Sequence, residues 1–354
     1  MRRILGPMRV SIGIFAHNEQ GHIGRLLESL AEQDVMKIAA DRGDLLEIIT
    51  LANGCRDATA QEADVASGFI RCLHPSISSR TEVITESGKS NAWNMYVHRF
   101  SDPLADFLIF MDADITLVGK STLRLLIDAL VQNGDANVSV DVIIKDIAFK
   151  RRQTLKDRLS LAATKLNQTG PAKLAGSLYC GRAAILRGIW MPIGLLVEDG
   201  FLKAMVATRS FTKSEDQRSL IQVQGAAHTF EAVTHAQSVF KHEVRLLVGT
   251  WMNVVLFGHL RRMVSETKKT AGALIQEWNE ANPQWFPCLL RTGNRHPEFW
   301  RFTCNVLSLP IRQALRSNFR QCLIKLPVAL FRCAFTSAAL VSASGMIRKR
   351  VYQW

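Results

Sequence analysis

Two pairs of acidic residues carry the side chains best suited to chemistry. Asp112 and Asp114 flank Ala113, and Glu198 directly precedes Asp199. Carboxylate oxygens suit Mn²⁺ or Mg²⁺, and such a cation offsets the charge of a departing nucleotide diphosphate. Glu198 or Asp199 would act as a general base that takes a proton from an attacking hydroxyl, and we favour Asp199. Together the two pairs indicate a metal-dependent sugar transferase.

Both pairs also have ordinary structural explanations. Aspartates are common in the polar turn that ends a strand, and carboxylates at 198 and 199 would stabilise the first turn of a helix. An Asp-x-Asp motif alone is weak evidence of function. The apolar run 107–111 before Asp112 strengthens it, because this run predicts a buried parallel strand. Ligands of open α/β sheets bind at the carboxyl edge of such strands.

The elements that position these carboxylates follow from the alternation of apolar patterns. Between residue 9 and about residue 137, strand-like runs alternate with helical spacings, which predicts an α/β fold with a mostly parallel central sheet flanked by helices. We expect a nucleotide-binding half at 9–137 and an acceptor half at 138–245. The expected strands are 45–51, 69–73, 107–111 and 137–144, and the expected helices include 23–30, 89–100 and 123–130.

The C-terminal region, 246–354, differs from the rest of the chain. The pattern is helical from about residue 234, and beyond Glu298 there are nine Lys or Arg and no Asp or Glu. Arg312, Arg316 and Arg320 would share one face of a helix, which suits an anionic membrane surface. The uncharged run 333–347 is shorter than the roughly 20 residues that cross a bilayer, so we expect it to lie in the interface. The alternative is a basic helix packed on the domain.

Composition limits the cellular setting and the partners. The net charge of +13 implies attraction to anions without choosing among nucleotides, lipids, glycans and nucleic acid. The seven cysteines form no Cys-x-x-Cys pair, and the first residues show no secretory signal. We therefore expect a cytoplasmic protein, peripheral on the inner membrane face. No nucleic-acid-binding motif is present, so nucleic acid is not an expected partner.

Several motifs in a consistent order resemble family 2 glycosyltransferases of the GT-A fold, over about 10–245. Residues 15–19 occupy the place of the family's Pro-Ala-Tyr-Asn-Glu, and residues 52–59 that of its Asp-Asp-Gly-Ser loop. Residues 88–94 match Gly-Lys-x-x-Ala-x-Asn. The two acidic pairs follow as the metal and base motifs. The resemblance implies an inverting enzyme that uses a nucleotide-sugar and forms no covalent sugar intermediate.

The resemblance also implies roles for individual residues. The metal ligands would be Asp112 and Asp114, with His228, His235 and His242 as candidates for a further ligand. The family's base-reading aspartate is replaced by Asn53, so a UDP-sugar is an inference and GDP or TDP remain open. The residues implied to contact the nucleotide-sugar are Ala16, His17, Asn18, Glu19, Asn53, Asp57, Lys89, Asp112, Ala113 and Arg245.

The region after the base motif bears on the product. Processive members carry Gln-x-x-Arg-Trp there, whereas residues 237–245 lack an intact motif, which favours transfer of one or a few sugars. Lys241 or Arg245 would still steady the diphosphate. The acceptor would be a glycan, as in polysaccharide biosynthesis, or a lipid-linked molecule. The alternatives are a non-catalytic membrane-associated scaffold that retains the fold, and a sugar-phosphate nucleotidyltransferase, which would need a Gly-rich loop that residues 15–19 lack.

Overall fold

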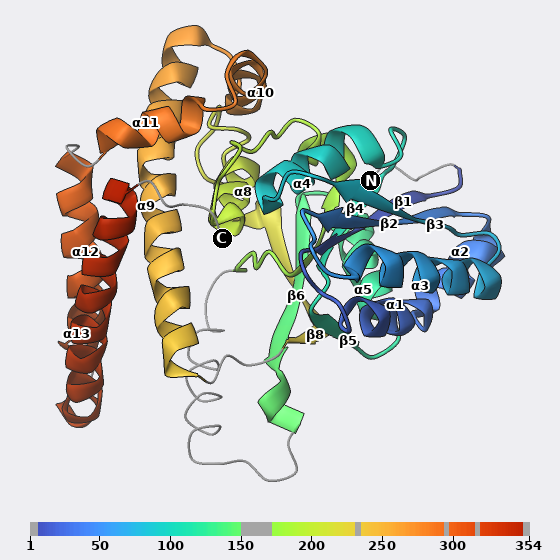
Figure 1. Ribbon diagram of the computed structural model, residues 1–354, viewed down its shortest axis with the longest axis horizontal. Coiled ribbons are helices and arrows are strands. Elements are labelled where there is room, and N and C mark those ends of the chain that lie inside the picture. Colours follow the sequence, from blue (N-terminus) through green and yellow to red (C-terminus); the bar gives the residue numbers. More distant parts are fainter. Residues whose placement is uncertain (1–5, 150–171, 231–234, 294–296, 316–318, 350–354) are drawn as a thin grey trace.

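A computed structural model describes residues 6–149, 172–230, 235–293, 297–315 and 319–349. It consists of an α/β domain with a layer of long helices along one side (Figure 1). The helix α9 (Ala236–Thr267) stands between the α/β domain and the helices α12 (Pro297–Leu315) and α13 (Phe319–Lys349). The short helices α10 (Ala271–Ala281) and α11 (Trp285–Gly293) lie at one end of α9.

The central sheet has eight strands in the order β3-β2-β1-β4-β7-β6-β8-β5. The first four are parallel, β7 is antiparallel to both of its neighbours, and β5 is antiparallel to β8. The predicted α/β fold is therefore confirmed, with a mixed rather than uniformly parallel sheet. The strand bounds are β1 (Arg9–Ala16), β2 (Leu45–Asn53), β3 (Ser78–Ile84), β4 (Phe107–Asp112), β5 (Ile115–Val118), β6 (Val138–Lys145), β7 (Leu178–Arg182) and β8 (Leu220–Phe230).

Two apolar cores cover the two faces of this sheet. One packs under α1, α2 and α5, and the other under α4, α8 and the C-terminal helices. The strand β4 is buried on both faces because its residues alternate between these two cores, which fits its continuous apolar run. The helices of the α/β domain are α1 (Ile23–Ala31), α2 (Asp34–Arg42), α3 (Thr59–Leu73), α4 (Lys89–Met95), α5 (Thr122–Gln132), α7 (Ala183–Leu186) and α8 (Glu198–Ala207).

The strand predicted at 69–73 is wrong. These residues form the last turn of α3, and the third parallel strand is β3. The buried positions of α3 include Ala63, Ser67 and Ile70, which are spaced as one face of a helix, whereas Phe69 and Leu73 are exposed. The short apolar run resembles a strand in sequence because it includes Phe69 and Leu73, two large apolar residues that lie at exposed positions of the helix.

The C-terminal helices share a core with the α/β domain. Val244, Val248 and Trp251 of α9 are buried in the same cluster as Phe201 of α8. The boundary predicted between 245 and 246 thus falls inside one continuous helix.

The expected single helix bearing three arginines is also wrong. Arg312 lies on α12 and Arg320 on α13, which packs against α12, while Arg316 lies outside the described residues. In the part of the chain that the structure describes, one segment, Leu326–Met346, has the length and hydropathy needed to cross a membrane.

Candidate active site

The Lys89 side chain joins the two acidic pairs. Lys89 is the first residue of α4, and its Nζ lies 2.6 Å from Oδ1 of Asp112 and 3.0 Å from Oε1 of Glu198. The carbonyl of Gly176 accepts a further bond from the same Nζ at 3.3 Å. A Cβ at Gly176 would lie 3.0 Å from Glu198 Oε1, so the absence of a side chain at this position allows the close approach. The end of β4 and the start of α8 therefore meet around one ammonium group.

Burial and charge act in opposite directions on this cluster. Burial raises the pKa of Asp112 and the Lys89 charge counters part of that increase, which leaves the pKa at about 6. For Glu198, burial also raises the pKa, but Lys89, a backbone hydrogen bond and the charge of Arg245 together outweigh it, and the pKa ends below its ordinary value. Burial lowers the pKa of Lys89, yet the two carboxylates hold it above its usual range. Lys89 stays a cation, and Glu198 stays ionised beside it.

Asp199 has a different environment from its neighbour. It lies in the first turn of α8, and its Oδ1 accepts a 2.6 Å hydrogen bond from the backbone N–H of Gly200. Burial, followed by the charge of Glu198, raises its pKa above the ordinary value. The helix-capping explanation thus fits its position, and a carboxylate with a raised pKa at the edge of this cluster also has the properties of a general base.

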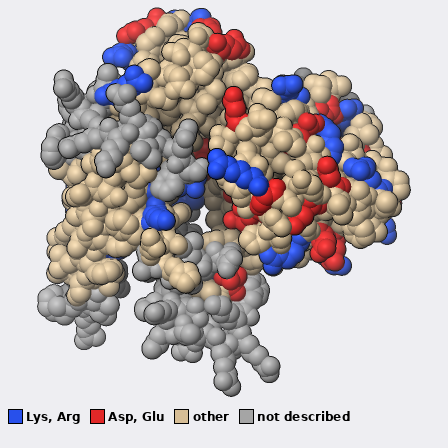
Figure 2. All heavy atoms as spheres, in the orientation of Figure 1, with Lys and Arg blue, Asp and Glu red and all other residues tan. Residues whose placement is uncertain are grey.

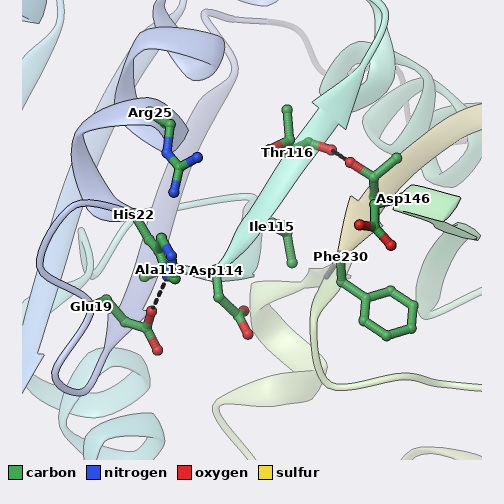
Figure 3. A pocket seen from close by; sticks show the side chains of 10 residues that line it. Glu19, His22, Arg25, Ala113, Asp114, Ile115, Thr116, Asp146 and Phe230 are labelled. Carbon is green, nitrogen blue, oxygen red and sulfur yellow. Dashed lines mark hydrogen bonds and ion pairs between the residues drawn. The ribbon is translucent and has the colours of Figure 1, made fainter. Parts of the chain in front are cut away.

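Asp114 lines a separate pocket. The pocket has a volume of about 450 Å³, and it is also lined by Glu19, His22, Arg25 and Asp146 (Figure 3). Glu19 accepts a 2.9 Å bond from His22 Nδ1, and burial raises its pKa, with a smaller contribution from the charge of Asp114. His22 and Arg25 are not among the residues expected from the sequence, although the spacing of three residues from Glu19 to His22 and from His22 to Arg25 is that of one face of a helix, and α1 begins directly after His22.

The donor set around Asp112 and Asp114 fits a hard divalent cation in its chemistry. Both are carboxylates, and in nucleotide-binding sites such a cation takes one or two carboxylates together with phosphate oxygens. Asp112 already neutralises a cation, because Lys89 contacts both of its oxygens. Among the described residues, no group of three or more His, Cys, Asp or Glu side chains is arranged to hold a metal ion by itself. Phosphate oxygens and water would supply the remaining ligands.

The loops after β1 and β2 are bonded to each other. His17 Nδ1 lies 2.6 Å from the carbonyl of Asn53, and Asn18 adopts a positive φ of 57° while its Oδ1 accepts the N–H of Arg56 at 2.8 Å. Asp57 accepts the hydroxyl of Thr59 and the N–H of Gln20, and the Thr59 bond lowers its pKa. Ala16 and Ala113 are buried at the strand ends. The Asp57 carboxylate is therefore bonded within these loops.

Asn53 carries an unused polar atom. Its side chain is 5% exposed, and its Oδ1 is buried without a hydrogen-bond partner in the described part of the chain. Such an atom usually has a partner in the functional state, because an unsatisfied buried acceptor costs about 1–3 kcal/mol. A ring N–H of a nucleotide base is a donor of the right kind.

The remaining candidates lie farther from the acidic pairs. Arg245 on α9 donates a long 3.5 Å bond to the carbonyl of Leu196, and its charge contributes to the lowered pKa of Glu198. His228 is fully buried on β8, with Nδ1 2.7 Å from Asp141 and Nε2 3.1 Å from Ser177 Oγ. Both of its ring nitrogens are thus engaged within the protein. His235 precedes α9, and His242 is exposed on that helix.

The comparisons with known proteins identify the class. The model of the glycosyl transferase family 2 matches residues 11–190, so the chain belongs to this family and is a family 2 glycosyltransferase. A comparison with curated proteins found no match.

Solved structures similar to this chain include three of glucosyl-3-phosphoglycerate synthase from Mycobacterium tuberculosis. The complex with phosphoglyceric acid is 16% identical with a TM-score of 0.45, covering 69% of this chain and 78% of that chain. The complex with Mn²⁺, UDP-glucose and phosphoglyceric acid is 16% identical, with a TM-score of 0.44 and coverage of 68% and 78%. The complex with Mn²⁺, UDP and glucosyl-3-phosphoglycerate is 18% identical, with the same TM-score and the same coverage.

Proposed function

We propose that this family 2 glycosyltransferase is metal-dependent and inverting, and moves a sugar from a UDP-sugar to the hydroxyl of a glycan or lipid-linked acceptor. The observation that carries the proposal is the contact of Lys89 with both Asp112 and Glu198. It brings the acidic pair after β4 and the acidic pair at the start of α8, which are distant in the chain, to one ammonium group. Nucleotide departure and acceptor activation can therefore take place side by side.

The residues at the nucleotide end would bind and orient the donor. Asn53 Oδ1 would accept the N–H of the base, and the loop that holds His17 and Asn18 would border the ribose. Asp112 and Asp114 would hold a divalent cation, which when bound neutralises charge that develops on the leaving diphosphate. Lys89 would add a fixed positive charge beside the same oxygens.

The base motif would activate the acceptor. Glu198 is held by Lys89 and has a lowered pKa, so it is poorly suited to accept a proton. Asp199 has a raised pKa, and would take the hydroxyl proton as the oxygen attacks the anomeric carbon from the side opposite the nucleotide. A single displacement of this kind inverts the anomeric configuration.

Nucleotide binding tests the donor and metal assignments. We expect UDP to bind in the presence of Mn²⁺, and Asp114→Ala or excess chelator to weaken binding about 100-fold, because a metal contact supplies several kcal/mol. The measurement is isothermal calorimetry with UDP, GDP and TDP. The matched control is Asp64→Ala, which removes an exposed aspartate from α3. Equal binding by wild type and Asp114→Ala would contradict the metal assignment, and preference for GDP or TDP would correct the donor class.

We also propose that α12 and α13 hold the enzyme peripherally on an anionic membrane surface, on the cytoplasmic face. One side of α13 buries Ala329, Ala339 and Ala343, whereas Phe331 and Val341 on other sides are 71% and 76% exposed. In Figure 2 this helical layer presents a surface with few charged side chains, while acidic and basic groups gather on the α/β domain. Exposed apolar side chains on α13, together with the exposed Arg312 of α12 and Arg332 of α13, favour an interfacial position.

Vesicle binding tests this surface. Replacing Phe331 and Val341 together by glutamate should lower partition onto phosphatidylserine-containing vesicles by about tenfold or more, because burial of each side chain contributes about 1.5–3 kcal/mol. The matched control replaces Phe69 and Val65 of α3, which are 54% and 76% exposed, in the same way. Equal losses in the two double variants, or no binding by the wild type, would refute the proposed membrane surface.

A further inference from the structure

The loop that leads into the base motif is held by the C-terminal helices at three places. Gly272 of α10 meets the carbonyl of Gly188, since a Cβ at Gly272 would lie 2.0 Å from that oxygen. Asn279 of α10 donates a 2.9 Å bond to the carbonyl of Met191, which also accepts Nδ2 of Asn94 from α4 at 2.8 Å. The third place is Val197, immediately before Glu198, where α9 makes its contacts.

Gly249 of α9 allows the contact with Val197. A Cβ at this position would lie 2.1 Å from Cγ2 and 2.7 Å from Cβ of Val197, so any larger residue must displace Val197 or α9. A glycine inside a helix costs about 1 kcal/mol relative to alanine. At Gly249 the chain accepts this loss of helix stability, and the missing side chain lets α9 approach Val197, the residue before the base motif, directly.

Asn253 lies one turn farther along the same helix. Its side chain is 5% exposed, and its Nδ2 donates a 3.0 Å bond to the carbonyl of Val197. The same Nδ2 would lie 3.3 Å from a Cβ at Gly200, the residue after Asp199. Asn253 therefore contacts the chain on both sides of the base motif.

We propose that α9 positions the general base, with Gly249 and Asn253 as positioning residues that set the place of Val197 and thereby of Asp199. This inference rests on the proposed role of Asp199 as the base. It assigns a part in the reaction to the stretch of α9 beyond Arg245, which the sequence marked only by its helical, membrane-like composition. Because Lys89 also holds Glu198, contacts from both α4 and α9 fix the start of α8.

The test compares Gly249→Ala with Gly345→Ala. Gly345 lies inside α13 and a Cβ there meets nothing within 4 Å, so it controls for the change in helix propensity. The activity is UDP release from a panel of UDP-hexoses with water as the acceptor. We expect Gly249→Ala to lower kcat about 100-fold, as a shift of about 1 Å does, with KM and the calorimetric Kd for UDP nearly unchanged. Gly345→Ala should retain wild-type kinetics.

Two further variants separate positioning from loss of folding. Asn253→Ala removes the bond to Val197 without adding atoms, and should lower kcat about tenfold with UDP binding retained. Val197→Ala removes the Cγ2 nearest to the added methyl, so the pair Val197→Ala with Gly249→Ala should recover part of the lost kcat. Wild-type kcat in Asn253→Ala, or parallel loss of kcat and UDP binding in folded Gly249→Ala, would overturn the proposal.

Asp199→Asn, measured in the same assay, separates failure of the base assignment from failure of the positioning role. If it keeps wild-type kcat, the assignment of the base is wrong and the positioning proposal falls with it. If it is inactive while both α9 variants keep wild-type kcat, the base assignment stands and only the positioning role is refuted.

Discussion

Asp199→Asn should lower the rate of sugar transfer by roughly 10²–10⁴-fold, the usual contribution of a general base. Asparagine keeps the size of the side chain and an oxygen that can accept the Gly200 N–H, so α8 should still begin at the same place. Binding of UDP should be unchanged because Asp199 lies outside the loops that would hold the nucleotide. The measurement is UDP release from UDP-hexoses at saturating donor, with calorimetry of UDP as the control.

The pH dependence adds a second readout to this prediction. The base must be ionised, and burial together with Glu198 raises the pKa of Asp199, so wild-type activity should fall as pH decreases through a pKa above that of an ordinary aspartate. The residual activity of Asp199→Asn should lack the part of this acidic limb that belongs to Asp199, whereas a part that belongs to Asp112, with its pKa of about 6, should remain. A variant that keeps the limb and the wild-type rate would move the role of base to another carboxylate, with Glu198→Gln as the next variant to measure.

Lys89→Met should both destabilise the protein and abolish its activity. Removal of the ammonium leaves the carboxylates of Asp112 and Glu198 in a largely buried site without their shared cation, which costs about 3 kcal/mol. Thermal unfolding should therefore begin several degrees lower than in the wild type. Mn²⁺ should raise the melting temperature of the variant more than that of the wild type, because a divalent cation can replace part of the missing charge.

The matched control for this variant is Lys120→Met. The Lys120 ammonium lies 3.8 Å from Glu32, with both side chains at least 70% exposed, and such surface pairs contribute little to stability. Calorimetric unfolding of both variants measures whether loss of Lys89 lowers the melting temperature more than loss of Lys120 does. Equal melting temperatures for the two would show that the Lys89 cluster has no special energetic role, and normal activity of Lys89→Met would remove Lys89 from the site.

Local patterns were sufficient for the fold class and the family. The parallel strands are short apolar runs followed by polar loops, and the carboxyl ends of such strands meet at one edge. This logic located β2, β4 and β6, and the order of the motifs indicated the family that the comparison confirms. It failed at 69–73, because a five-residue apolar run contains too little periodicity to distinguish a strand from an exposed helix end.

By itself, the sequence determined that acidic pairs at 112–114 and 198–199 belong to a sheet edge and a helix start, since strand and helix periodicities are properties of neighbouring residues. Only the tertiary structure decided how each carboxylate is used. Lys89 pairs with Asp112 and Glu198, and α9 reaches Val197 through Gly249 and Asn253. These partners are remote in the chain, and burial and charge at their meeting point set the pKa differences between Glu198 and Asp199, which no local spacing encodes.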